Sequence, residues 1–192
     1  YIFPEGVANI GNSVFQNCIG LTSVTFPNSV TSIGDSAFSG CTGLLSLTIP
    51  NNITSIDNSS FAGCTGLTSV TFHCKMIGSW FRGNTSLKQV VIGDEATKID
   101  SNAFDGCMGL SSVIIGNNVT SIGYRAFRNC CFDLTEVTLP ESLTIIGEAA
   151  FNGCSALTSI AIPNNVTDIG NSSFSGCTSL VSLTLGTGVK TI

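Results

Sequence analysis

The chain has 192 residues and a formal net charge of −5 at pH 7, with 43% hydrophobic and only 10% charged residues. Its seven Lys and Arg residues form no basic run, which excludes nucleic acid as a partner because phosphate binding needs clustered cations. No stretch approaches the roughly 18 consecutive apolar residues of a membrane-spanning helix, so no membrane span is predicted. Ser, Thr, Asn and Gly take the place of charge, a composition common on secreted proteins.

A near-identical phrase, opened each time by a leucine, recurs along the whole chain. Successive leucines are 20 to 24 residues apart. A fixed period in this range is typical of leucine-rich repeats, which stack into a solenoid without linkers. We therefore predict a single solenoid over residues 1–192, with about eight units of about 23 residues. Both ends fall within a unit, so we expect a segment cut from a longer protein. The leucines are Leu21, Leu44, Leu67, Leu87, Leu110, Leu134, Leu157 and Leu180.

Each unit is expected to contain a short strand, a turn and a return segment. Residues 21–26 alternate apolar and polar side chains and end at Pro27, which predicts a strand that stops at the proline. Asp35 stands where an N-cap would begin a helical turn, and Gly40 where a left-handed C-cap would end it. The predicted fold class is an α/β repeat: a leucine-rich-repeat solenoid with a parallel β-sheet on the concave face and short helical turns on the convex face.

One phenylalanine occupies the same position of the return segment in all eight units. We expect these rings to stack about 5 Å apart inside the coil, the spacing of neighbouring strands. Their role is therefore structural. They are Phe15, Phe38, Phe61, Phe81, Phe104, Phe127, Phe151 and Phe174.

The repeat phrase, and above all its element Ala-Phe-Ser-Gly-Cys at residues 37–41, resembles the leucine-rich repeats of BspA-like proteins. These surface proteins occur in oral and gut bacteria and in the parasite Trichomonas. The resemblance covers the whole chain. It implies display at, or secretion from, the cell surface and binding to matrix proteins or other cells, and it supplies no catalytic residues.

Seven of the nine cysteines share one repeat position, three residues after the phenylalanine. Equivalent side chains point the same way and a buried Cys packs as a small hydrophobe, so we predict a ladder of free thiols. Asn84 takes this position in the shortened unit. Cys131 lies at a one-residue insertion, and Cys74 is either a reactive thiol or a partly buried turn residue. With one His and no C-x-x-C, neither a metal site nor a cofactor is predicted.

The pattern loses three residues within the stretch 73–86, here called the shortened segment. It contains His73, Lys75, Trp80 and Arg82, which include the only His and the only Trp of the chain. Because Trp and Arg are enriched at binding hot spots, these four residues are candidates for a partner site. The alternative is that Trp80 occupies a repeat position that is small in other units and fills the space left by the deletion.

The strand residues that point away from the core form a second candidate surface. Such faces of repeat proteins are usual binding surfaces. Ser and Thr dominate this face, which offers many weak hydrogen bonds and no obvious anchor. The candidates next to the shortened segment are Ser69, Thr71, Gln89, Val91, Ser112 and Ile114.

Sequons of the form N-x-S/T recur at two repeat positions. In a eukaryotic secreted protein they would accept N-linked glycans. The alternative is that the repeated phrase N-N-V-T generates them without function. The candidates are Asn52, Asn58, Asn118, Asn165 and Asn171.

Enzyme activity is not predicted, because there is no Ser-His-Asp arrangement, metal cluster or phosphate-binding glycine loop. We hypothesise an extracellular or cell-surface module that binds a protein or glycan partner through its repeat surface. The alternative is a structural component, in which copies of the chain stack end to end into an extracellular fibre or surface layer.

Overall fold

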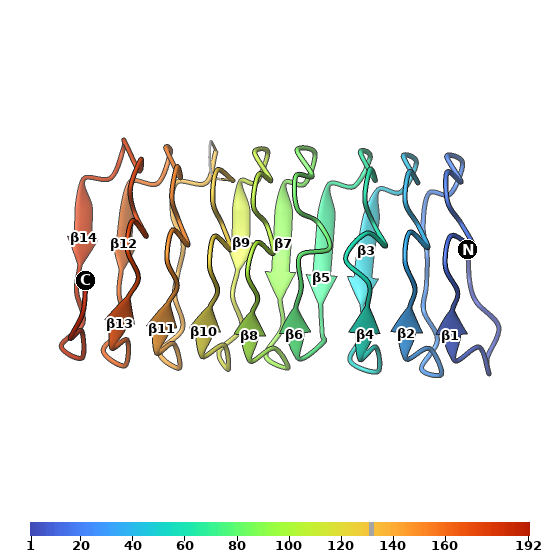
Figure 1. The fold of residues 1–192 in the computed structure, drawn as a ribbon, viewed down its shortest axis with the longest axis horizontal. Helices are drawn as coiled ribbons and strands as arrows, with labels where there is room; N and C mark the ends of the chain where they lie inside the picture. The colour runs from blue at the N-terminus through green and yellow to red at the C-terminus, as the bar shows by residue number, and fades with distance from the viewer. Residues whose placement is uncertain (131–132) are drawn as a thin grey trace.

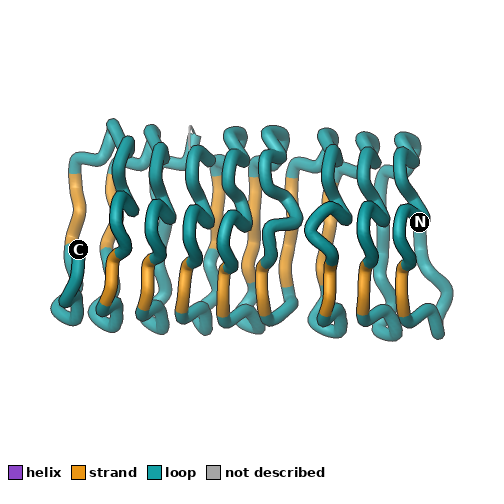
Figure 2. The backbone as a smooth tube through the Cα atoms, viewed as in Figure 1, coloured by secondary structure: helices purple, strands orange, loops and turns teal. Residues whose placement is uncertain are grey.

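The computed structural model describes residues 1–130 and 133–192, which form a solenoid whose coils lie side by side along one axis (Figure 1). Each coil contributes to two layers. One layer holds the longer strands, and the other holds two-residue strands followed by the return segment (Figure 2). Strands of the two layers run in opposite directions, as expected of a chain that turns back once per coil.

All strand pairing within the two layers is parallel. The long-strand layer contains the sheet of β3 (Ser46–Ile49), β5 (Ser69–Phe72), β7 (Gln89–Ile92) and β9 (Ser112–Ile114), then the pair β12 (Ser159–Ala161) and β14 (Ser182–Thr184). The short-strand layer contains the sheet of β1 (Asn9–Ile10), β2 (Ser32–Ile33) and β4 (Ser55–Ile56), then that of β6 (Met76–Ile77), β8 (Lys98–Ile99), β10 (Ser121–Ile122), β11 (Ile145–Ile146) and β13 (Asp168–Ile169).

The long strands follow the period-two pattern of the sequence. In β3, Leu47 and Ile49 are buried while Ser46 and Thr48 are exposed. Strand pairing matches equivalent residues, so Leu47 lies beside Val70 of the next coil. Inward residues therefore form continuous apolar rows, and the outward rows stay in solvent.

The predicted phenylalanine stack is confirmed at six of its seven steps. Stacked ring centroids lie 5.2 to 5.6 Å apart, as in the pair Phe38 and Phe61 at 5.4 Å. Phe81 and Phe104 do not stack; Phe72 instead contacts both rings edge-on, at 5.8 and 6.1 Å. A row of aromatic rings thus runs through the whole interior, and its one irregular step lies beside the shortened segment.

The predicted helical turns are wrong: no helix occurs in residues 1–130 or 133–192. In the return segment, alternate N–H groups donate to the next coil, as Phe38 N does to Ser60 O at 2.8 Å. The N–H groups between them close tight turns within the coil, as Cys41 N does to Phe38 O at 3.1 Å. Asp35 caps no helix, and its N–H donates to Asn12 Oδ1 of the preceding coil. Because half of the donors bond sideways, no i→i−4 ladder forms.

The left-handed conformation predicted at the Gly or Asn of each return segment is confirmed in all eight units. Gly40, for example, has φ 73° and Asn17 has φ 59°. In six units a second left-handed residue, such as Ser36 with φ 55°, precedes it by four positions. The paired left-handed residues redirect the chain sideways, which explains why Gly and Asn recur where a helix was expected.

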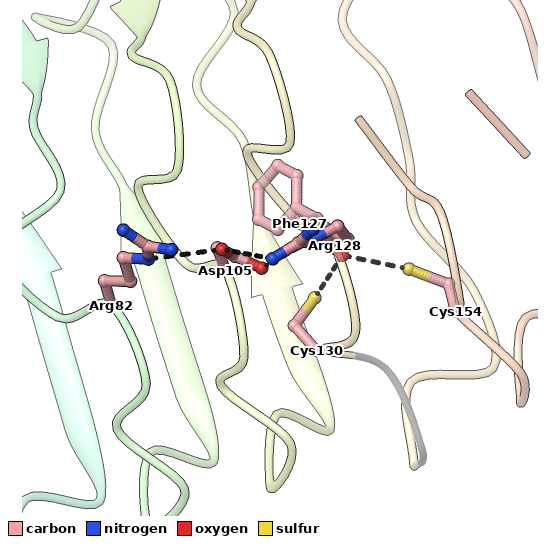
Figure 3. A network of polar contacts seen from close by, with 6 residues as sticks. All are labelled: Arg82, Asp105, Phe127, Arg128, Cys130 and Cys154. Atoms are coloured by element: carbon pink, nitrogen blue, oxygen red, sulfur yellow. Dashed lines mark hydrogen bonds and ion pairs between the residues drawn. The ribbon is translucent and has the colours of Figure 1, made fainter. Parts of the chain in front are cut away.

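The cysteine ladder is a set of hydrogen bonds between coils. Cys41 Sγ donates to Phe15 O at 3.0 Å, and Cys107 Sγ donates in the same way to Phe81 O at 3.1 Å. Phe127 O accepts from Cys154 of the following coil, as in regular coils, and also from Cys130 of its own coil (Figure 3). Cys131 lies outside the described residues. The thiols from Cys41 to Cys177 in the ladder thereby supply hydrogen-bond donors to main-chain carbonyls.

Two irregularities interrupt the layers, one in each. The three-residue deletion separates the short strands, because β4 and β6 end their respective sheets and do not pair. In the other layer, the four-stranded sheet ends at β9, and the next strands along the chain, β12 and β14, form a separate pair. On the long-strand side, β5 still pairs with both β3 and β7. At the shortened segment, the coils therefore separate in the short-strand layer but stay paired in the long-strand layer.

Candidate partner-binding groove

A groove of about 650 Å³ lies where β4 and β6 fail to pair. Its walls are the facing edges of these two strands, each of which pairs with a strand on its other side, and Trp80 is one of its lining residues. The gap between β4 and β6 is visible in Figure 1, where neighbouring short strands elsewhere lie closer together. The lining residues are Asn51, Ile53, Thr54, Ser55, Ile56, Asn58, Cys74, Lys75, Met76, Gly78, Trp80, Thr97 and Asp100.

The groove exists because main-chain hydrogen bonds that join other coils are missing here. In a regular step, Gly34 N donates to Ile10 O at 2.9 Å, and Asp100 N donates to Ile77 O at 2.8 Å. Gly78 holds the equivalent position, yet its N–H makes no such bond to Ile56 O in the described chain. Deleting three residues leaves too little chain to bring this edge against the preceding coil.

Trp80 replaces part of the missing contact. Its indole Nε1 donates to Ile56 O at 2.9 Å, so a side chain takes the place of the main-chain N–H. The ring packs 6.1 Å from Phe72. A Cβ at position 78 would approach the indole Cε2 to 2.7 Å, so only glycine leaves room for the ring there. Trp80 thus fills space opened by the deletion and also forms part of the groove wall.

The floor of the groove is apolar, and the equivalent side chains of regular coils are covered by the neighbouring coil. Ile56 is only partly buried, whereas Ile33 and Ile99 of regular coils are 1% and 0% exposed. Met76 is 52% exposed at the rim. Together with Trp80, these side chains offer an apolar surface that no part of the described chain covers.

One positive charge lies at the rim. Lys75 is exposed and has no ion-pair partner among the residues that the structure describes, whereas Asp100 is paired with Lys98 at 2.7 Å. Cys74 is 3% exposed and burial raises the pKa of its thiol to about 11. Of the two interpretations of Cys74, its burial favours the turn residue over the exposed, reactive thiol.

Arg82 lies on the return segment and takes part in a charge network. Its Nε donates to Asp105 Oδ2 at 3.2 Å, while Arg128 contacts the same carboxylate at 2.8 and 3.0 Å (Figure 3). Asp105 is only 4% exposed. The three residues share one repeat position in successive units, so the carboxylate bridges cations from the coils on either side. Its hydrogen bonds raise the pKa of Arg128.

The other candidate residues separate into two groups. His73 Nδ1 lies 3.5 Å from Glu95 Oε2, and both side chains are partly exposed. The strand-face candidates lie in the long-strand layer on β5, β7 and β9, away from the groove at β4 and β6. Among them, Gln89 and Ile114 are the most exposed. The structure therefore joins Trp80 and Lys75 in one groove, but does not join them to the strand face.

The sequons also divide according to their side-chain contacts. Asn118 and Asn165 donate their amide nitrogens to Asp94 O and Glu141 O, and Asn52 donates to Pro27 O at 3.2 Å and to Val30 O. Each of these three amides thus bonds to main-chain carbonyls of the preceding coil in the turn after the long strand. Asn58 lines the groove, with its Oδ1 accepting from Ser79, and Asn171 is exposed.

Sequence reasoning located the deletion but missed the groove-lining residues Met76, Ile56 and Asp100. They occupy ordinary repeat positions, so their composition carried no indication of a site. The available indication was the deletion itself, since removing residues from one coil of a stacked array must break contacts with its neighbour. Among the described residues, no cluster of three or more His, Cys, Asp or Glu side chains is placed to hold a metal ion. The same residues contain no helix with the length and apolar character needed to cross a bilayer.

These features define a solenoid of leucine-rich repeats with parallel strands and one opened coil. The family model described as BspA type leucine rich repeat region (6 copies) matches residues 1–110 and 75–192. The chain therefore belongs to the BspA-type leucine-rich-repeat family, which confirms the resemblance seen in the sequence. None of the curated proteins compared with it matches.

Solved structures of bacterial repeat proteins share this architecture. A leucine-rich repeat protein from Bacteroides ovatus has 27% identity and a TM-score of 0.75, over 99% of this chain and 55% of that one. A leucine rich cell surface protein from Faecalibacterium prausnitzii has 27% identity and a TM-score of 0.60, over 96% and 59%. A third, from Eubacterium ventriosum, has 31% identity and a TM-score of 0.63, over 68% and 36%. The chain thus spans less than two thirds of the length of these relatives.

Proposed function

We propose that this chain is a non-catalytic binding segment of an extracellular or cell-surface protein, which recognises a protein or glycan through its repeat surface. The observation that carries the proposal is the outward row of the long-strand layer. Its side chains run in register from β3 to β9 and take no part in the core. A surface that folding does not need is available for binding. The cell-surface relative from Faecalibacterium prausnitzii supports the proposed location.

The composition of this row suits recognition by many weak contacts. Ser69, Thr71 and Ser112 supply hydroxyl groups, and Ile114, 54% exposed, supplies an apolar contact on β9, the last strand of the sheet. Parallel rows with a regular spacing match extended polymers such as matrix proteins or glycan chains. The binding surface is then the row as a whole.

The test is binding of the purified chain to immobilised matrix proteins and to a glycan array. We expect saturable binding to at least one, weakened about tenfold or more by the double variant Gln89→Ala, Ile114→Ala. Ser23→Ala, Thr25→Ala is the matched control, since these residues lie on the coil before β3 and outside the row from β3 to β9, and it should bind normally. Saturable binding that both double variants leave unchanged would contradict a role for this face.

The structural alternative makes a different prediction for the same protein. A self-assembling component forms filaments whose length rises with concentration, visible by electron microscopy and sedimentation. Monomers at every concentration, together with partner binding, favour the binding module. Filaments without any partner would favour the structural component.

A further inference from the structure

We propose that the groove between β4 and β6 binds an extended peptide segment of a partner protein, one that carries a carboxylate next to an apolar side chain. The proposal rests on the proposed binding function and assigns it a second, separate site. The peptide lies along the open edge of β6 and adds a strand there. Strand addition to an exposed sheet edge is a common mode of peptide recognition.

The open edge presents hydrogen-bond donors whose usual acceptors are absent. In regular coils, Thr54 N donates to Thr31 O and Thr97 N donates to Lys75 O, each at 2.9 Å. Lys75 N is the equivalent donor of the shortened segment, and no main-chain carbonyl of the preceding coil in the described chain accepts from it. Gly78 N likewise donates to no main-chain carbonyl of the preceding coil in the described chain. Peptide carbonyl groups are the acceptors that these two donors lack.

The opposite wall is arranged to receive a side chain. The carbonyl of Ile56 is already bonded to the Trp80 indole, so β4 offers less of its main chain to a peptide than β6 does. The floor of Ile56, Met76 and Trp80 is apolar, and it is exposed enough to gain from burial. An apolar or aromatic peptide side chain fits this floor.

The positive charge of Lys75 favours a peptide that carries a carboxylate. Lys75 is the rim cation, and it has no ion-pair partner in the described residues. A peptide carboxylate beside the apolar side chain pairs with it. The main-chain donors argue for a peptide as the occupant in preference to a sugar, since a sugar needs no row of strand-edge N–H groups.

The first test is selection of short linear peptides from a random display library on the intact chain. We expect enriched peptides to share an acidic residue adjacent to an apolar one. A selected peptide, made synthetically, should bind Met76→Lys and Lys75→Glu about tenfold more weakly or worse. It should also slow hydrogen exchange at the amides of Lys75 and Gly78, which a contact made by side chains alone would leave unchanged.

Matched controls use the same repeat positions in regular coils. Ile145 is the equivalent of Met76 and is 46% exposed, and Lys190 is the equivalent of Lys75. Ile145→Lys and Lys190→Glu should keep the affinity within about twofold. Replacing the peptide's acidic residue with lysine should restore binding to Lys75→Glu. Circular dichroism confirms folding, and if Met76→Lys does not fold, Lys75→Glu decides the test.

The proposal is overturned if the selection enriches no peptide, or if both groove variants bind the selected peptide with unchanged affinity. It is also overturned if no peptide is enriched and a glycan binds the natural chain but not Met76→Lys. The last result would make the groove a sugar site. If the chain still binds a partner through the strand face, only this inference fails. If it binds no partner of any kind, the proposed function fails as well.

Discussion

The indole N–H of Trp80 donates to the main-chain carbonyl of Ile56 at 2.9 Å, in the place where regular coils use a main-chain N–H of the following coil. The indole thus bridges the two coils on the side where the deletion separates them, as does the hydrogen bond from Ser79 to Asn58 Oδ1. The opposite side needs no such bridge, since β3 and β5 pair over four residues. The shortened coil is consequently held on one side by a sheet and on the other by side-chain hydrogen bonds, of which the indole bond is one.

Trp80→Phe is expected to keep most of the packing and lose this hydrogen bond. We predict a fall of about 1 kcal/mol in the free energy of unfolding, the usual net value of one bond. Because Trp80 is the only tryptophan, unfolding in urea must be followed by circular dichroism. Met108→Leu, an exposed change in a regular coil, is the control. Equal stability of Trp80→Phe and the natural protein would show that the bond contributes nothing.

Asp105 is expected to matter more for stability than either arginine that it contacts. Asp105→Ala leaves two guanidinium groups without their shared carboxylate, at a cost of about 2 kcal/mol, below the cost for a fully buried pair because both arginines reach solvent. Arg82 is 58% exposed, so Arg82→Ala should cost less than about 1 kcal/mol. Chemical unfolding of both variants provides the comparison, and a larger effect from Arg82→Ala would contradict this ranking.

The buried thiols predict how stability depends on alkaline pH. Burial raises the pKa of Cys64 and Cys107 from 9.0 to about 12 in the folded chain. Above pH 9 the unfolded chain therefore releases thiol protons that the folded chain retains, so stability falls as pH rises from 9 towards 12. Cys107→Val should reduce this fall by removing one such thiol.

Thiol labelling checks the same burial at neutral pH. In a Cys131→Ser background, an alkylating reagent should modify exposed Cys18 first and reach Cys64 and Cys107 only on unfolding. Mass spectrometry of digested samples identifies the order. Labelling of Cys107 as fast as Cys18 in the folded protein would contradict a closed interior at this coil.

The two classes of sequon should differ in their effect on stability. Asn52→Ala removes donors to the carbonyls of Pro27 and Val30, and we expect a loss of about 1–2 kcal/mol. Asn171 is exposed, and Asn171→Ala should stay within about 0.5 kcal/mol. After secretion from a eukaryotic cell, glycan occupancy should be higher at Asn58 and Asn171 than at Asn52. Full occupancy at Asn52 with unchanged stability would contradict the structural role of that amide.

Several parts of the fold could be predicted because they depend on local pattern. Inward residues such as Leu47 and Ile49 follow from alternation, and the left-handed residue at Gly40 follows from the recurrence of Gly or Asn. The return segment was predicted as helical, since Asp35 and Gly40 are the residues that cap helices. The helix fails because Phe38 N bonds to the neighbouring coil, and the sequence of one unit contains no information about that neighbour.

The sequence predicted the position of the groove along the chain but not the side of the coil on which it opens. The irregular stretch and its unusual residues Trp80 and Lys75 were visible in the sequence. The side on which the coil opens depends on which strands keep their pairing after the deletion, and that is a property of two coils together. Arg82 appeared equivalent to Trp80 as a candidate, but its carboxylate partner lies 23 residues further on, in the following coil.

Amide hydrogen exchange can show whether the deletion opens the short-strand layer between β4 and β6 in solution. In the free protein, we predict that the amides of Lys75 and Gly78 exchange orders of magnitude faster than those of Thr97 and Asp100, their equivalents in the next coil, which donate to Lys75 O and Ile77 O. Equal protection at both pairs would show that the coils close together in solution, and it would contradict the groove.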